Sequence, residues 1–338
     1  MSTAITRDDA PVYLAKYEKR RLENLVGDVE IASGEPPFVA RARERATQRA
    51  LEEMRSDSGP AGRTIAFANE TVAPRELQYP DSFRHRVATS IDVRLIRHGQ
   101  TQGYITDGAL TPLGRWQAHR KGADLAKGLK EGMTVKLPHA PTARAKETAE
   151  GVRGGVLSSL SRYGIGDVTV EDPEPNAAFD NFQVYVDGKE MDVTAAFIEF
   201  ANTREIYNRF GNGDRPGWMV EIDRFFRVEQ AGGDPITHWL THPLQYFEPS
   251  ALVVRRHWKG IVEMAQRCDA NTKVYMCGHS GPIRAVAASA VGHDPGEPFN
   301  TEDVRIKIYD DLEHAVVTYR GRGQEIEIPT TVTPSWYA

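Results

Sequence analysis

The sequence predicts an α/β protein, a three-layer α/β/α sandwich with a mostly parallel central sheet. From about residue 90 onward, short β-rich runs alternate with helical segments, and two of these runs end in the histidine-containing turns Arg97-His98-Gly99 and Gly278-His279-Ser280. Strands that alternate with helices pair in parallel and are covered on both faces. Ligands bind at the carboxyl ends of such strands, so the two turns are predicted to lie at one functional edge.

Residues 1–88 precede this alternation and are predicted to form a helical and loop-rich extension. The spacing of apolar residues predicts a first helix that ends at Gly27 and a second over 38–55, and turn-forming residues at 59–80 indicate a linker. The chain therefore divides into this extension and a catalytic domain over 89–338. The extension either packs on the core, covers the mouth of the site or joins two subunits, so a homo-oligomer remains an open alternative.

The catalytic domain contains a regular series of expected elements. Strands are expected at 91–96, 135–137, 168–170 and 273–277, followed by antiparallel strands at 305–309, 315–319 and 325–328. Helices are expected at 111–130, 141–152 and 249–267.

The segment at about 176–248 breaks this rhythm and is rich in aromatic residues and glycine. Its aromatic side chains are expected to form a small core of their own, and the alternative is that some of them line a pocket for a bulky or apolar leaving group. His238 and His242 are four residues apart, a spacing that would put both on one helix face for a metal. Pro243 disfavours a regular helix there, so no metal site is predicted.

Composition narrows the class of protein. The chain has 338 residues, 40% of them hydrophobic and 26% charged, with a net charge of −5, and this mild acidity provides no general attraction to nucleic acid or an anionic membrane. The two cysteines make neither a disulfide framework nor a zinc spacing. With no signal-peptide pattern at the start and no run approaching the ~18 apolar residues of a membrane span, we expect a cytoplasmic protein.

Four segments resemble the motifs of the histidine phosphatase superfamily, which is phosphoglycerate mutase-like, and they occur in that family's order. The segments are Arg97-His98-Gly99-Gln100-Thr101, Leu110-Thr111-Pro112-Leu113-Gly114, Pro141-Thr142-Ala143-Arg144-Ala145-Lys146-Glu147-Thr148-Ala149 and Gly278-His279-Ser280-Gly281-Pro282-Ile283-Arg284. The resemblance covers about residues 91–290 and implies that the segment at 176–248 is a cap over the active site.

The resemblance implies that His98 is the nucleophile and that Arg97, Arg144, His279 and Thr101 bind the substrate phosphate. These residue types suit the chemistry, because a neutral imidazole attacks phosphorus to form a phosphohistidine. Arginines stay protonated and offer a planar fork of donors to phosphoryl oxygens. The scheme calls for no metal and no cofactor.

The general acid is harder to assign, although hydrolysis requires a proton for the leaving oxygen and then a base for water. The family supplies a carboxylate after the third strand, and the best register puts Asp180 at that position. Glu174 and Asp187 remain alternatives.

The sequence therefore predicts a phosphomonoester hydrolase acting on a small or medium-sized phosphorylated metabolite. A phosphomutase with the same intermediate and a low-turnover phosphate-binding regulatory module are the alternatives. The chain departs from the family's usual residues at Gln100, Tyr104 and Ala140. These departures leave substrate identity and the choice between hydrolase and mutase open.

Overall fold

The computed structural model describes residues 90–101, 108–210, 215–329 and 336 of the chain. The predicted extension over 1–88 lies outside the described residues, and so does Tyr104. Within the described ranges, no helix is both long and apolar enough to cross a membrane.

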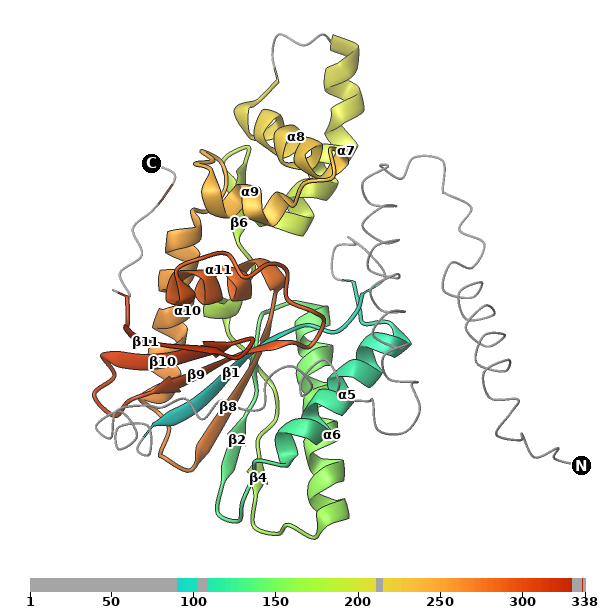
Figure 1. The fold of residues 1–338 in the computed structure, drawn as a ribbon. Helices are drawn as coiled ribbons and strands as arrows, with labels where there is room; N and C mark the ends of the chain where they lie inside the picture. The colour runs from blue at the N-terminus through green and yellow to red at the C-terminus, as the bar shows by residue number, and fades with distance from the viewer. Residues whose placement is uncertain (1–89, 102–107, 211–214, 330–335, 337–338) are drawn as a thin grey trace, which may run out of the picture.

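A nine-stranded sheet forms the centre of the described structure (Figure 1). Its strands are β1 (Ile91–Arg97), β2 (Thr134–Lys136), β3 (Pro138–His139), β4 (Thr169–Val170), β5 (Glu174–Pro175), β8 (Thr272–Gly278), β9 (Asp303–Ile308), β10 (His314–Tyr319) and β11 (Arg322–Glu327). The order is β11-β10-β9-β1-β8-β2-β4, and β3 pairs with both β8 and β5. Pairing is parallel from β1 through β8 to β2 and β4, and antiparallel from β1 through β9 to β11. The predicted α/β fold is confirmed.

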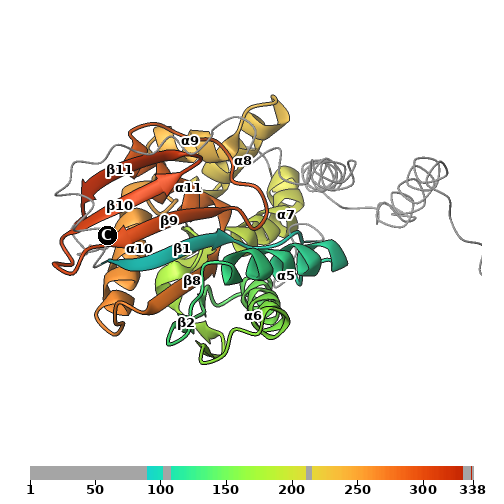
Figure 2. The same cartoon turned by 60° about the horizontal axis from the view of Figure 1, so that its bottom comes forward.

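Helices cover both faces of this sheet, which makes the three layers visible in Figure 2. One face carries α5 (Pro112–Ala126) and α6 (Ala143–Tyr163), and the other carries α10 (Ser250–Ala265) and α11 (Ser280–Val291). Alternation along β1 explains this arrangement, because Ile96 packs in the cluster with α5 and α6, whereas Leu95 packs in the larger cluster with α10 and α11.

Helix α6 is longer than predicted, because it continues from residue 152 to Tyr163 and ends at Gly164 in the left-handed conformation. The glycines inside α6 do not end the helix. They let it approach α5: a Cβ on Gly155 would lie 1.9 Å from the carbonyl oxygen of His119. These are packing positions, and a local propensity rule misreads them as a helix end.

Between β5 and α10 the chain leaves the sheet and forms the segment expected to cap the site (Figure 1). It contains the short helix η1 (Ala177–Phe179), the hairpin of β6 (Gln183–Val186) and β7 (Lys189–Asp192), and the helices α7 (Val193–Phe210), α8 (Gly217–Gln230) and α9 (Pro235–Thr241). Its buried aromatic side chains pack on one another, with Phe182 stacked on Trp239 at 4.3 Å between ring centroids and Phe197 against Phe226 at 4.4 Å. These aromatics belong to one hydrophobic cluster that also contains Leu95 of β1 and Trp258 of α10, so the segment shares the core of the sheet and does not have the separate small core that was expected.

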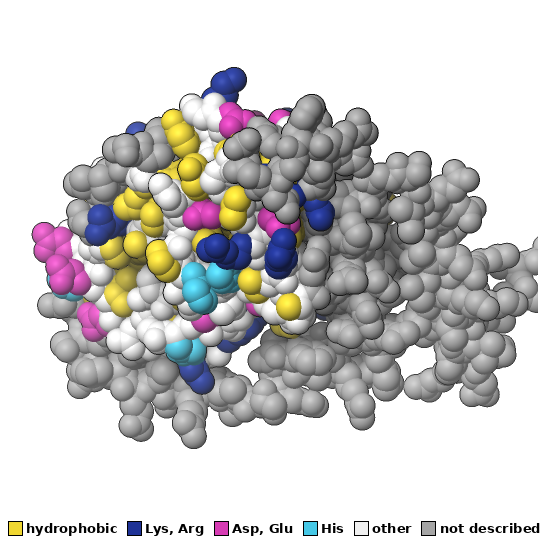
Figure 3. Space-filling view, turned by 90° about the horizontal axis from the view of Figure 1, so that it is seen from above, with side chains coloured by type: hydrophobic (Ala, Val, Ile, Leu, Met, Phe, Trp, Pro, Cys, Tyr) yellow, Lys and Arg dark blue, Asp and Glu magenta, His cyan; other side chains and the backbone are white. Residues whose placement is uncertain are grey.

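Seen from the side on which this segment lies, the surface mixes hydrophobic side chains with histidines and with charges of both signs (Figure 3). His238 lies on α9, and His242 is the residue that caps its carboxyl end. Their ring centroids are 4.3 Å apart. In the described part of the chain, no group of three or more His, Cys, Asp or Glu is placed to hold a metal ion.

Candidate functional site

Strand register brings the two histidine turns together. Strands β1 and β8 are parallel neighbours in which Arg97 pairs with Gly278, so the residues that follow, His98 and His279, leave the sheet side by side. The backbone N–H of His98 donates to the carbonyl of Gly278 at 2.8 Å. The two imidazole rings lie edge to face, with centroids 5.5 Å apart. The sheet thus places both histidines at its carboxyl edge, as predicted.

The hydrogen bond of His98 determines where its proton lies. Nδ1 of His98 lies 2.8 Å from the carbonyl oxygen of Gly99, and a carbonyl only accepts, so Nδ1 carries the hydrogen and Nε2 keeps its lone pair in the neutral ring. Burial and the charges of Arg144 and Arg97 hold the pKa of His98 well below its usual value of 6.5. At neutral pH the ring is therefore uncharged and suited to nucleophilic attack through Nε2.

Arg144 reaches the same place from the first turn of α6, which follows β3. Its Nε donates to Nδ1 of His279 at 3.3 Å, and both side chains are buried. Because Nδ1 of His279 accepts, the single proton of the neutral ring sits on Nε2, which lies 3.5 Å from the hydroxyl of Thr142. Burial, with the charge of Arg144, also holds the pKa of His279 well below its usual value. His279 is thereby a neutral donor beside His98.

The turn after β1 is fixed by a close backbone approach. A Cβ on Gly99 would lie 2.5 Å from the carbonyl oxygen of Gly114 in α5, and one on Gly114 would lie 2.2 Å from that of Gln100. Only glycine lets these two segments meet. Gln100 is buried and accepts from the Thr111 hydroxyl at 2.9 Å, so its side chain serves this junction. Thr101 is half-buried and forms an isolated antiparallel β-bridge with Leu110, just after the turn that carries His98.

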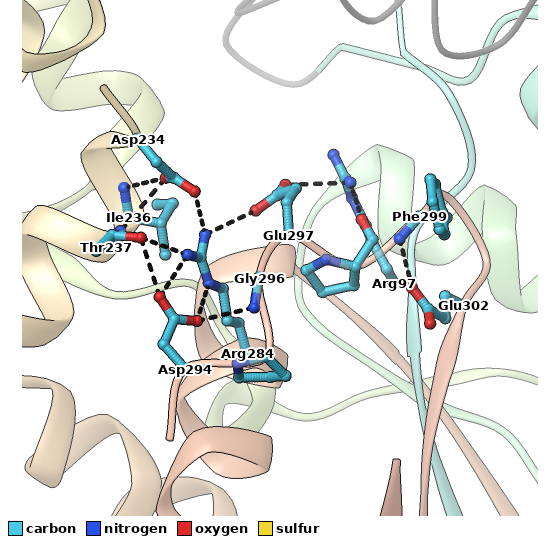
Figure 4. Close-up of polar contacts among 12 residues, drawn as sticks. Arg97, Asp234, Ile236, Thr237, Arg284, Asp294, Gly296, Glu297, Phe299 and Glu302 are labelled. Atoms are coloured by element: carbon cyan, nitrogen blue, oxygen red, sulfur yellow. Dashed lines mark hydrogen bonds and ion pairs between the residues drawn. The ribbon is translucent and has the colours of Figure 1, made fainter. Parts of the chain in front are cut away.

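Arg97 points toward the loop that follows α11 (Figure 4). It forms an ion pair with Glu297 at 3.1 Å and donates to the carbonyl of Pro298, while its Nε is buried without a partner. The other oxygen of Glu297 lies 3.6 Å from Arg284. Arg97 is thus held on one side by a carboxylate, while its Nε–H makes no hydrogen bond.

Arg284 is almost fully buried and connects that loop to α9 (Figure 4). It binds both oxygens of Asp294 at 2.6 Å and reaches Asp234 at 2.7 Å. The hydrogen bond from Arg284 holds the pKa of Asp294 down to about 2. Through this cluster, charged contacts link the start of α9, the loop after α11 and Arg97.

The three carboxylates proposed for the acid role lie in different surroundings. Glu174 is exposed in β5. Asp187 is exposed in the turn of the β6–β7 hairpin and accepts from Trp218 at 2.8 Å. Asp180 is half-buried, follows β5 and η1 at the carboxyl edge, and senses the charge of Arg144. Burial raises the pKa of Asp180, and the charge of Asp192 raises it further, against the lowering effect of the Asn181 backbone N–H.

Asp192 is a site residue that sequence reasoning missed. Its Oδ1 accepts from the backbone N–H of Thr194 at 2.8 Å, while its Oδ2 is buried without a hydrogen bond, 3.9 Å from Nη2 of Arg144. The acidic position at the end of β7 carries no sequence signal of its own, because only the folding of the hairpin over the sheet brings it to Arg144. A carboxylate there attracts the guanidinium of Arg144 and raises the pKa of Asp180.

Comparison with known proteins finds similarity among solved structures. No family model matches the chain, and no curated protein matches it. Among solved structures, it is similar to a phosphoglycerate mutase from Bacillus anthracis, at 15% identity and a TM-score of 0.43, covering 70% of this chain and 96% of that one. It is also similar to a mycobacterial glucosyl-3-phosphoglycerate phosphatase in complex with VO3, at 16% identity and a TM-score of 0.41, covering 68% and 96%.

A third similar structure is Bacillus stearothermophilus YhfR, at 19% identity and a TM-score of 0.39, covering 65% of this chain and 92% of that one. Two of these three structures are thus named as a mutase and a phosphatase.

Proposed function

We propose that this chain is a histidine phosphatase, a phosphomonoester hydrolase that works through a phosphohistidine at His98. The observation that carries the proposal is the state of His98: a neutral ring with its hydrogen on Nδ1, beside the Arg144–His279 pair. A neutral imidazole beside cationic and N–H donors is suited to attack on phosphorus.

In the first step, Nε2 of His98 forms a bond to phosphorus as the bond from phosphorus to the ester oxygen breaks. Arg97, Arg144 and Nε2–H of His279 stabilise the negative charge on the transferring oxygens, with Thr101 at the edge of the pocket. Asp180 donates its proton to the leaving oxygen, which departs as an alcohol.

In the second step, water attacks the phosphohistidine while the Asp180 carboxylate accepts the water's proton. The nitrogen–phosphorus bond breaks, inorganic phosphate leaves, and both His98 and Asp180 return to their starting states. The substrate is a small or medium-sized phosphorylated metabolite, and these steps use no cofactor. We keep a cytoplasmic setting as part of the proposal, supported by two cysteines that are both unpaired thiols. A homo-oligomer remains a prediction.

Phosphate release is the test, measured with purified protein over a panel of phosphate monoesters in the presence of a chelator. We expect release by the wild type, loss in His98→Ala, and no change in His119→Ala, whose side chain is exposed. An acid-labile, alkali-stable phosphoryl label on the wild type would identify the intermediate.

The same assay separates the alternatives. A mutase would return the phosphoryl group to the product rather than release it, and a regulatory module would bind inorganic phosphate with little turnover. Wild-type turnover by His98→Ala would overturn the proposed mechanism.

A further inference from the structure

The segment that carries Asp180 is held by one side chain of helix α10, that of Arg256. Nη1 of Arg256 donates to the carbonyl oxygens of Ala178 at 3.1 Å and Asp180 at 3.0 Å, and Nη2 donates to that of Asn181 at 2.9 Å. These carbonyls belong to η1 and to the stretch between η1 and β6, where the chain leaves the sheet for the 176–248 segment. One guanidinium therefore fixes the backbone on both sides of the acid.

Glu248 fixes the orientation of that guanidinium. Its two carboxylate oxygens accept from Nε and Nη2 of Arg256 at 3.0 and 2.9 Å, a two-pronged pairing, and the glutamate is buried. The same carboxylate accepts from the backbone N–H of Gln183 at 3.1 Å, and the N–H of Glu248 donates to the Gln183 carbonyl at 2.8 Å. The Arg256–Glu248 pair therefore holds the acid segment from residue 178 to residue 183.

We propose that Arg256 is the positioning residue of the general acid, holding the Asp180 carboxyl group in reach of the leaving oxygen. This inference rests on the proposed function, because it needs Asp180 to donate a proton. Arg256 makes its contacts with backbone carbonyls and Glu248, so it acts through Asp180. A general acid must lie within hydrogen-bond reach of the atom it protonates, and a misplacement of about 1 Å costs about 10²-fold in rate.

Comparing substrates with different leaving groups distinguishes a positioning role of Arg256 from a general contribution to the stability of the fold. A phenolate with a strongly electron-withdrawing substituent leaves without a proton, whereas an alkoxide needs one. Loss of acid placement therefore slows phosphoryl transfer to His98 from alkyl phosphates far more than from p-nitrophenyl phosphate, and kcat/KM reports this step. A loosened fold would slow both alike, since His98 and the phosphate pocket serve both substrates.

The experiment measures kcat and KM of Arg256→Met for glycerol phosphate and p-nitrophenyl phosphate. We expect a loss of about 10²-fold in kcat/KM for the alkyl ester and less than about fivefold for the nitrophenyl ester, because kcat/KM reports the transfer to His98 and not the hydrolysis of the phosphohistidine that both esters share. Asp180→Asn should show the same selectivity. The double variant should be no slower than Asp180→Asn alone, because both changes remove one function.

Arg256→Lys retains the charge without the planar fork and should fall between the wild type and Arg256→Met. If Arg256→Met does not fold, Arg256→Lys is the variant that tests the proposal. The pH profile adds a second readout: the charge of Arg256 lowers the pKa of Asp180, so Arg256→Met should move the alkaline limb to higher pH, whereas Arg256→Lys should move it less.

Arg153→Met is the matched control. Arg153 also donates to a backbone carbonyl, that of Glu171 at 3.1 Å, and pairs with a carboxylate, Asp172 at 3.0 Å, on a segment that lacks the acid. It should show no leaving-group selectivity. Equal losses of Arg256→Met on both esters, or additive losses in the double variant, would overturn the positioning role while leaving the His98 mechanism intact. Turnover by His98→Ala would instead overturn the proposed function.

Discussion

Nε of Arg144 lies 3.3 Å from Nδ1 of His279 and donates its hydrogen to it. A guanidinium has no acceptor, so this contact alone settles which nitrogen of His279 carries the proton. His279 therefore presents Nε2–H as a donor, and His98 presents a lone pair on its own Nε2. The two neutral histidines take opposite roles because Nδ1 of His98 faces an acceptor, a carbonyl oxygen, whereas Nδ1 of His279 faces a donor, the Arg144 guanidinium.

Replacing His279 tests its role as a donor to the phosphoryl group. His279→Ala should lower kcat/KM by about 10²–10³-fold, the typical effect of removing one donor from a transition-state pocket. His279→Gln, whose amide can still donate, should lose less. Steady-state kinetics with one good substrate checks both. Equal losses in the two variants would mean that the donor hydrogen is not what His279 contributes.

Asp192 should set the upper pH range of the reaction. Burial raises the pKa of Asp180 and the negative charge of Asp192 raises it further, and Asp180 must be protonated to act as the acid. Activity is therefore lost as pH rises through this pKa. Asp192→Asn removes the charge, lowers the pKa of Asp180 and should shift the alkaline limb of kcat/KM to lower pH. A pH profile with an alkyl phosphate measures the shift, and an unmoved limb would contradict the coupling.

Glu297 should weaken phosphate binding at Arg97. Its carboxylate pairs with Arg97 at 3.1 Å, so it competes with an incoming anion and repels it (Figure 4). Glu297→Gln should tighten the binding of inorganic phosphate by about three- to tenfold, or about 1 kcal/mol. Glu302→Gln is the control, because Glu302 pairs with Arg320 at the end of the same loop. Calorimetric titration with phosphate measures both, and weaker binding by Glu297→Gln would contradict the prediction.

His257 should make the protein less stable in acid. It is buried against Phe179, and burial, with the charge of Arg256, lowers its pKa to about 3. The unfolded chain binds a proton at His257 below about pH 6.5, while the folded chain does so only near pH 3. The unfolding free energy should therefore fall by about 1.4 kcal/mol per pH unit from this group as pH drops through that window.

His257→Phe removes this titration while retaining an aromatic ring beside Phe179. Urea unfolding at several values between pH 7 and pH 4 should give a shallower loss of stability for the variant than for the wild type. Parallel slopes for the two proteins would show that His257 does not carry the effect.

The sequence alone determined the α/β alternation and the two turns that end β1 and β8. Parallel strands end at one edge, so the meeting of His98 and His279 follows from local patterns and one general rule. Arg144 was assigned to the site by the resemblance of its segment to the family's motif, and the structure starts its helix after β3, a strand that pairs with β8.

Tertiary structure decided the acidic half of the site. Glu174, Asp180 and Asp187 lie within one short stretch of sequence, and only the pairing of β5 and the turn of the hairpin separate their environments. Asp192, Arg256 and Glu297 reach the site through the cap, α10 and the loop after α11. Their contacts bridge residues far apart in the chain, and such pairing depends on how separate elements pack rather than on local propensity.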